Sequence, residues 1–140
     1  MHWEQKYKLD IPVIDAQHKQ IISCLSDLVE AMREGCSSRD IEELFTRIEL
    51  YTVRHFGLEE KYMAESNYPG LEKQRQAHQF FVSRFGRVVD EYKESGMSSA
   101  VVNNLRQELT EWIKNHVTGL DREFGEYFRH YQKELPGFPG

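Results

Sequence analysis

The chain has 140 residues, of which 39% are hydrophobic and 29% are charged, and its net charge at pH 7 is −5. This length and composition are typical of one soluble globular domain with its own core. No stretch approaches the ~20 apolar residues of a membrane span, and Lys and Arg form no cluster. We therefore expect neither a membrane nor a nucleic acid as a partner.

The first ten residues, MHWEQKYKLD, lack the basic and apolar regions of a signal peptide, so a cytoplasmic location is expected. Cys24 and Cys36 are too few for a disulfide framework and do not form a metal-binding pair, so both are expected to be reduced thiols. Residues 1–12, with Pro12 near their end, are expected to form an extended arm that packs Trp3 and Tyr7 on the rest of the domain.

Beyond the arm, apolar residues recur with a period of 3.5 to 3.6, which is the period of an α-helix. Short breaks rich in Gly, Pro and Ser interrupt this pattern. Gly35 and Gly96 suit helix C-terminal positions, and serines at 37–38 and 98–99 suit N-caps. The predicted helices span residues 13–34, 39–64, 70–94 and 99–132.

Short connections between long amphipathic helices favour antiparallel neighbours. The expected fold class is therefore all-α, an up-down-up-down four-helix bundle with an extended N-terminal arm. We expect a single domain over residues 1–140, with the arm at 1–12, the bundle at 13–132 and a tail at 133–140.

Each predicted helix places one histidine on its core-facing side, and two carboxylates join them. A single histidine on an apolar face is usually an ordinary core residue with a satisfied hydrogen bond. Four together with two acids are different, because burying polar or charged groups costs several kcal/mol unless they are paired or bind a metal. The six residues are His18, His55, His78, His116, Glu59 and Asp121.

The depth of these residues along the bundle indicates that they meet. They lie near the starts of the first and third helices and late in the second and fourth, and in an up-down-up-down bundle these parts share one end. Imidazole and carboxylate ligands without thiolate suit iron, manganese or zinc. Carboxylates from two different helices can each bridge two ions, so the sequence predicts a dinuclear metal site. Ferritin-like sites are disfavoured because the Glu-x-x-His motif is missing from the core-facing positions.

Four segments carry a resemblance to a known family. They are IDAQHKQII around His18, HFGLEEKYM at 55–63, YPGLEKQRQAHQFF at 68–81 and WIKNHVTGLD at 112–121. Over essentially its whole length the chain resembles the hemerythrins, specifically the single-domain bacterial ones.

The resemblance implies two iron ions, joined by an oxo or hydroxo bridge, that bind O2. It implies that His18 and His55 ligate the iron with an open position, and that His78 and His116 ligate the other iron. Glu59 and Asp121 would bridge the pair. The family also has a third histidine on the second iron, one turn before His78.

At that position this chain has Gln74. The Gln74 amide oxygen can bind iron directly, as a weaker donor than imidazole, or the side chain can stay outside the ligand shell and hold a water or hydroxide that fills the position. A third possibility is a loosely held second iron, and a fourth is that Gln74 only fills space beside an otherwise normal pair.

The expected function is O2 carriage, storage or sensing rather than catalysis. The alternative is a diiron enzyme with peroxidase, oxidase or NO reductase activity, which the loss of one histidine favours; a third hypothesis is a bundle whose iron is inactive or replaced by zinc. A monomer or weak oligomer is expected.

The candidate residues for a dry O2 pocket are Ile22, Phe56, Phe81 and Trp112.

Two local predictions complete the sequence-based description. His116 and Asp121 are five residues apart, about 140° around an ideal helix, so both can face one site only if the helix is distorted near Thr118 and Gly119, as in a π-bulge. Glu60 points about 100° away from Glu59 and is expected to be either solvated or hydrogen-bonded to a metal ligand.

Overall fold

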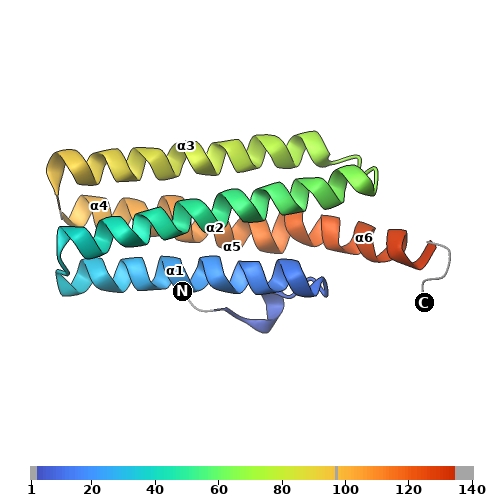
Figure 1. The fold of residues 1–140 in the computed structure, drawn as a ribbon, viewed down its shortest axis with the longest axis horizontal. Coiled ribbons are helices and arrows are strands. Elements are labelled where there is room, and N and C mark those ends of the chain that lie inside the picture. Colours follow the sequence, from blue (N-terminus) through green and yellow to red (C-terminus); the bar gives the residue numbers. More distant parts are fainter. Residues whose placement is uncertain (1–2, 97, 135–140) are drawn as a thin grey trace.

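The computed structural model describes residues 3–96 and 98–134, and the regular secondary structure of these residues is helical, with no β-strand. Four long helical rods lie side by side and alternate in direction, with the connections at the two ends of the bundle (Figure 1). The all-α four-helix bundle is confirmed. The first three rods are α1 (Pro12–Glu34), α2 (Ser38–Glu65) and α3 (Leu71–Ser95).

The ends of these helices follow from local sequence. Gly35 and Gly96 take positive φ angles of 70° and 68°, a conformation that costs glycine little. The hydroxyl oxygen of Ser37 accepts from the backbone N–H of Asp40 at 3.2 Å, and that of Ser98 accepts from Val101 at 3.2 Å. The predicted helix boundaries and N-caps are confirmed to within one or two residues.

The arm packs against the bundle near the start of α1. It includes one turn of 3-10 helix, η1 (Gln5–Tyr7), so it is only partly extended. Tyr7 is buried, Trp3 packs against the main core, and the backbone N–H of Leu9 donates to the Asp15 carboxylate at 2.8 Å. The packing of Trp3 and Tyr7 is confirmed, while residues 1–2 and 135–140, which belong to the predicted arm and tail, lie outside the described residues.

The fourth rod is divided by two π-helical segments. Its parts are α4 (Ser99–Leu105), η2 (Arg106–Thr110), α5 (Glu111–His116), η3 (Val117–Asp121) and α6 (Arg122–Glu134). The distortion predicted near Thr118 and Gly119 is confirmed by η3, whereas η2 was not predicted.

The π segments change which side chains face the core. Trp112, one of the candidate pocket residues, is only half-buried, and the adjacent Ile113 is buried. At the start of the same rod, Val101 is buried and Val102 is half-buried. Each segment adds a residue to one helical turn, so a regular period written from the sequence loses phase here.

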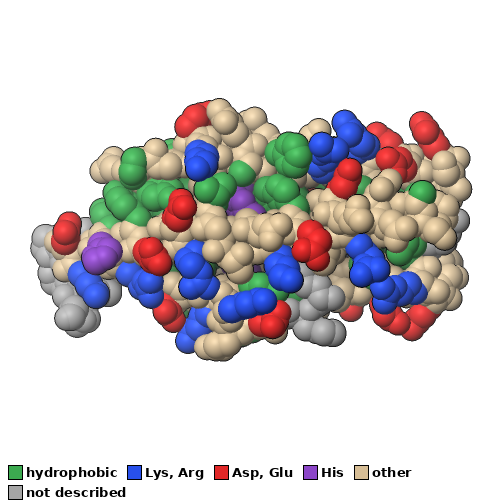
Figure 2. Space-filling model, turned by 180° about the vertical axis from the view of Figure 1, so that it is seen from behind, with side chains coloured by type: hydrophobic (Ala, Val, Ile, Leu, Met, Phe, Trp, Pro, Cys, Tyr) green, Lys and Arg blue, Asp and Glu red, His purple; other side chains and the backbone are tan. Residues whose placement is uncertain are grey.

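Apolar side chains fill the bundle on both sides of one polar layer. The larger cluster extends from that layer toward the α1–α2 connection, and a smaller one of Leu9, Ile11, Ile14, Met63 and Phe124 closes the opposite end. On the outer surface, acidic and basic side chains are interspersed over the face seen in Figure 2. Among the described residues, no helix is long and apolar enough to cross a membrane.

Candidate metal centre

The polar layer contains the residues singled out by the sequence. The four histidines come from α1, α2, α3 and α5, and Glu59 and Asp121 come from α2 and η3. All six side chains are buried, with relative exposures of 7% or less. In Figure 1 the starts of α1 and α3 and the ends of α2 and α6 lie at the same end of the bundle, which explains how residues so distant in sequence meet.

The ligand atoms form two groups that share both carboxylates. His18 and His55 lie with Glu59 and Asp121 in one group, and in each group the candidate ligand atoms lie within 4.8 Å of one another. The second group combines His78 and His116 with the same Glu59 and Asp121. Two neighbouring sets of four oxygen and nitrogen ligands with two shared carboxylates match a dinuclear site.

Individual distances show how the carboxylates lie between the rings. The Nε2 atoms of His55 and His78 lie 3.2 and 3.3 Å from the same oxygen of Glu59, Oε1. On the other carboxylate, Asp121, His18 Nε2 is 3.2 Å from Oδ2 and His116 Nε2 is 3.1 Å from Oδ1. His18 Nε2 also lies 3.8 Å from Oε2 of Glu59, so each carboxylate contacts at least one histidine from each group.

The fit to a metal is supported by unsatisfied polar atoms. Buried polar atoms normally have hydrogen-bond partners, and leaving one without costs about 1–3 kcal/mol. Among the described residues, eight of the ten buried side-chain atoms without a hydrogen bond belong to this layer. The eight are Nδ1 and Nε2 of His18, both oxygens of Glu59, Oε1 of Gln74, Nε2 of His78 and of His116, and Oδ2 of Asp121. Lone pairs left in this way are suited to bind cations.

Gln74 lies inside the same layer, one turn before His78, with 1% relative exposure. Its Nε2 donates to Asp121 Oδ1 at 3.1 Å, and its Oε1 has no hydrogen-bond partner. The side chain thus combines a contact to a shared carboxylate with a free amide oxygen, an arrangement compatible with both ligation and an outer supporting role.

Two outer residues orient the histidine rings. His55 Nδ1 is 2.8 Å from the amide oxygen of Gln17, and His78 Nδ1 is 2.9 Å from Oε2 of Glu60. Because a carboxylate only accepts, a neutral His78 with its proton on Nδ1 satisfies the contact to Glu60, and this tautomer leaves Nε2 free for a metal. Of the two expectations for Glu60, the hydrogen bond to a candidate ligand is confirmed, with His78 as the partner. The sequence did not predict the contact between Gln17 and His55. The one available signal was a polar side chain directly before His18.

Flat aromatic rings cover two of the histidines. Phe56 stacks on His78 with ring centroids 3.9 Å apart, and Trp112 stacks on His116 at 4.5 Å. Phe81 lies 4.9 Å from Trp112 between their centroids. Three of the four predicted pocket residues therefore form one aromatic wall beside the layer, and Ile22 is buried in the adjoining core.

A small cavity of about 10 Å3 adjoins the layer, close to the space that one water-sized molecule needs. Its apolar lining is Ile21, Phe56, Ile113 and Val117, and its polar lining is His18, His55, His116 and Asp121. Only Phe56 of the predicted pocket residues lines it. That the other three border a bound ligand stays a prediction.

The charges of the layer offset one another. Burial works to lower the pKa of His18, but Asp121 and Glu59 outweigh it and raise this pKa. Burial also works to raise the pKa of Asp121, yet His116 and His18 hold it well below its usual value. For Glu59, burial and the charge of Asp121 are likewise overcome by His55 and His78, and the pKa is lowered. A metal would therefore replace protons shared among these groups.

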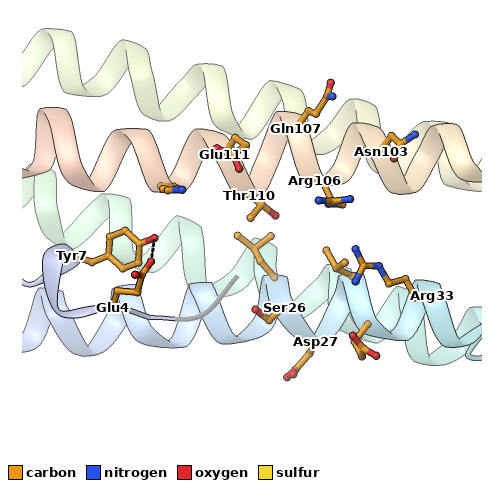
Figure 3. A pocket seen from close by; sticks show the side chains of 14 residues that line it. Glu4, Tyr7, Ser26, Asp27, Arg33, Asn103, Arg106, Gln107, Thr110 and Glu111 are labelled. Atoms are coloured by element: carbon orange, nitrogen blue, oxygen red, sulfur yellow. Dashed lines mark hydrogen bonds between the residues drawn. The ribbon is translucent and has the colours of Figure 1, made fainter.

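A second hollow, of about 780 Å3, lies between α1, the arm and the rod formed by α4, η2 and α5 (Figure 3). It is lined by polar side chains such as Arg33, Arg106 and Glu111. None of the predicted site residues lines it, and the chemistry-bearing groups are concentrated at the much smaller cavity.

Known proteins are similar to this chain over most of its length. The family model for the hemerythrin HHE cation binding domain matches residues 9–128, which include every residue of the polar layer. The chain belongs to the hemerythrin family. A bacteriohemerythrin of Stenotrophomonas maltophilia is 30% identical over 134 residues, covering 95% of this chain and 84% of that protein.

More distant hemerythrins match as well. A bacteriohemerythrin of Pseudomonas aeruginosa is 29% identical over the same shares of both chains. A myohemerythrin of Riftia pachyptila is 23% identical over 122 residues, covering 87% of this chain and 88% of its own. The resemblance noted in the sequence is thereby confirmed for the family.

Proposed function

We propose that this hemerythrin is a non-haem diiron protein that binds O2. The observation that carries the proposal is the pair of four-ligand groups sharing Glu59 and Asp121, with unsatisfied lone pairs directed into one layer. When bound, two iron ions would supply the electrons and the open position that a small oxidant such as O2 requires.

In this proposal His18 and His55 hold one iron and His78 and His116 hold the other. Glu59 and Asp121 would contribute to both, in keeping with their contacts to at least one histidine of each group. Gln74 supports the second iron through its contact to Asp121, and its free amide oxygen is the seventh candidate ligand.

The surrounding residues support a small ligand and an oxidation-resistant site. The cavity beside His18 and His55 is close to the size of one water molecule, so it has no space for a larger organic substrate. Ile21, Ile113 and Val117 line it with apolar side chains, so water and protons have restricted access to the bound ligand. This environment favours binding and release of O2 over its irreversible reduction.

A second function, the reduction of peroxide or NO, is favoured by Gln74. The half of the layer with His78 and His116 has one imidazole fewer than the family pattern, which leaves a weaker or open position there. An open position on that half would admit a second small ligand and speed oxidation of the iron.

One experiment separates the two functions. The protein is loaded with two equivalents of Fe(II) without air, O2 is added, and the visible absorption spectrum is followed through cycles of O2 removal and return. A band that appears and disappears reversibly supports O2 binding. Rapid irreversible bleaching, together with consumption of added peroxide or NO, supports the enzyme. One equivalent of metal or none, with no band, contradicts both proposals.

We further propose that residues 1–140 act as one domain, in a cytoplasmic monomer or weak oligomer. The continuous core from the arm to α6 and the family match over residues 9–128 support a single domain. Analytical ultracentrifugation of the full chain tests the oligomeric state.

A further inference from the structure

The two histidines of the layer with an outer hydrogen bond do not have equivalent partners. His55 Nδ1 donates to a neutral amide oxygen on Gln17, whereas His78 Nδ1 donates to a carboxylate oxygen on Glu60. Both rings direct Nε2 to the same oxygen of Glu59, at 3.2 and 3.3 Å. The two rings therefore have similar positions relative to Glu59. They differ in the charge of the residue that accepts the hydrogen bond from Nδ1.

Glu60 is held in place from its outer side. Its Oε1 accepts from Arg75 Nε at 3.3 Å, while its Oε2 accepts from His78. The side chain of Glu60 is 27% exposed and that of Arg75 is 46% exposed, so the carboxylate stands between the layer and the solvent. Both oxygens of Glu60 have a partner, which restricts the orientation of the carboxylate.

A carboxylate behind a histidine makes the opposite nitrogen a stronger donor to a metal, because the shared Nδ1 proton leaves more electron density on the ring. A neutral amide acceptor gives a weaker effect. Glu60 acts on the half that contains His78 and His116, and this is the half in which Gln74 stands one turn before His78.

We propose that Glu60 is a positioning residue that compensates for the imidazole missing at Gln74, by fixing His78 with Nε2 inward and strengthening it as a ligand. The inference rests on the proposed metal site but not on O2 as its ligand. The other half of the layer, with His18 and His55, has no histidine replaced by glutamine. There the outer hydrogen-bond partner of His55 is the neutral side chain of Gln17.

The test compares Glu60→Gln with the unchanged protein, both loaded with Fe(II) without air. Excess bipyridine is added, and loss of the two irons is followed by absorbance of the chelator complex. Glu60→Gln keeps a hydrogen-bond acceptor but removes the charge, so we expect one of the two kinetic phases to accelerate about 10–100-fold. The iron reduction potential of the same half should become more positive, because a less electron-rich ligand stabilises Fe(III) less.

Glu72→Gln is the matched control. Glu72 Oε2 lies 3.7 Å from Arg75 Nη1, and the Glu72 side chain is 72% exposed. This variant removes one carboxylate from the same arginine without touching His78, so its iron-loss rates should equal those of the unchanged protein. The thermal midpoint of each metal-free variant reports any general loss of structure.

Compensation is tested by repeating Glu60→Gln in a Gln74→His background. With the third imidazole restored, the charge of Glu60 should matter less, and the acceleration should fall to a few-fold at most. An equal acceleration in both backgrounds, an equal acceleration of both kinetic phases, or no effect of Glu60→Gln would overturn the inference while leaving the diiron proposal standing. Failure of the unchanged protein to take up two irons would overturn both.

Discussion

At the scale of single residues, Gln74 decides how far this chain follows its family. The side chain is buried, donates to Asp121 Oδ1, and leaves its own oxygen without a hydrogen bond. An amide can do both because it carries a donor and an acceptor, whereas the neutral imidazole of a histidine ligand would give one nitrogen to the metal and point the other outward.

Replacing Gln74 by glutamate tests this dual role at nearly constant shape. In the metal-free protein the donor to Asp121 is lost and two carboxylates face each other, so the free energy of unfolding should fall by about 1–3 kcal/mol. In the iron-loaded protein the added charge should instead slow iron loss, since an ionised carboxylate binds a cation more strongly than an amide.

Urea unfolding of the metal-free protein and chelator-driven iron loss measure the two effects. Gln76→Glu is the control, because Gln76 is exposed on the same helix and should change neither quantity. Equal stability of the Gln74→Glu and unchanged metal-free proteins would show that the amide does not support Asp121.

At the scale of elements, the fourth rod differs from the other three. An ordinary α-helix would separate His116 and Asp121 by about 140°, and η3 closes this difference by widening one turn. The segment also resets the phase after it, so that Phe124 is buried in the small cluster near the arm. One irregular turn therefore serves both the site and the packing beyond it.

Deletion of Gly119 should be tolerated. Removing one residue converts the widened turn into a regular α-helical turn, with the histidine and the aspartate four residues apart on one face. Iron stoichiometry and helical circular dichroism should both be retained. Insertion of one alanine after Gly119 should instead rotate Asp121 and all of α6 by about 100°, abolishing binding of two irons. Loss of iron binding on deletion but not on insertion would contradict this role of η3.

At the scale of the whole molecule, the polar layer weakens the fold until a metal fills it. Two carboxylates and four histidines interrupt a core that is otherwise apolar on both sides. Their mutual contacts offset part of the cost of burial, but seven of their polar atoms, and Oε1 of Gln74 beside them, still lack a hydrogen bond. A ligand that binds only the folded chain stabilises it in proportion to its affinity and concentration.

Removal of the metal should therefore lower the thermal midpoint. Free metal at 100 times its dissociation constant adds about 3 kcal/mol, which corresponds to roughly 10 °C for a domain of this size. Differential scanning calorimetry of the iron-loaded and chelator-treated protein measures the difference. His18→Leu supplies the comparison, because one ligand is lost and the gain from added iron should shrink. Identical midpoints with and without metal would argue against a site built into the fold.

The sequence by itself determined the helices, their alternating directions and the layer at which six polar residues meet. It could do so because a helical period and short connections leave few ways to bury an amphipathic face. The sequence also predicted a distortion between His116 and Asp121, because a regular helix cannot direct two residues five positions apart into the same site.

Only the tertiary structure decided the partners outside the layer and the phase of the fourth rod. Gln17 and Glu60 reach His55 and His78 from neighbouring helices, and such contacts depend on rotation and side-chain direction rather than on spacing within one helix. The segment η2 exchanges Trp112 for Ile113 as the buried residue without any Gly or Pro in Arg106–Thr110 to mark it. Whether an extra residue in a helical turn is stable depends on the packing around that turn, and this packing exists only in the folded chain.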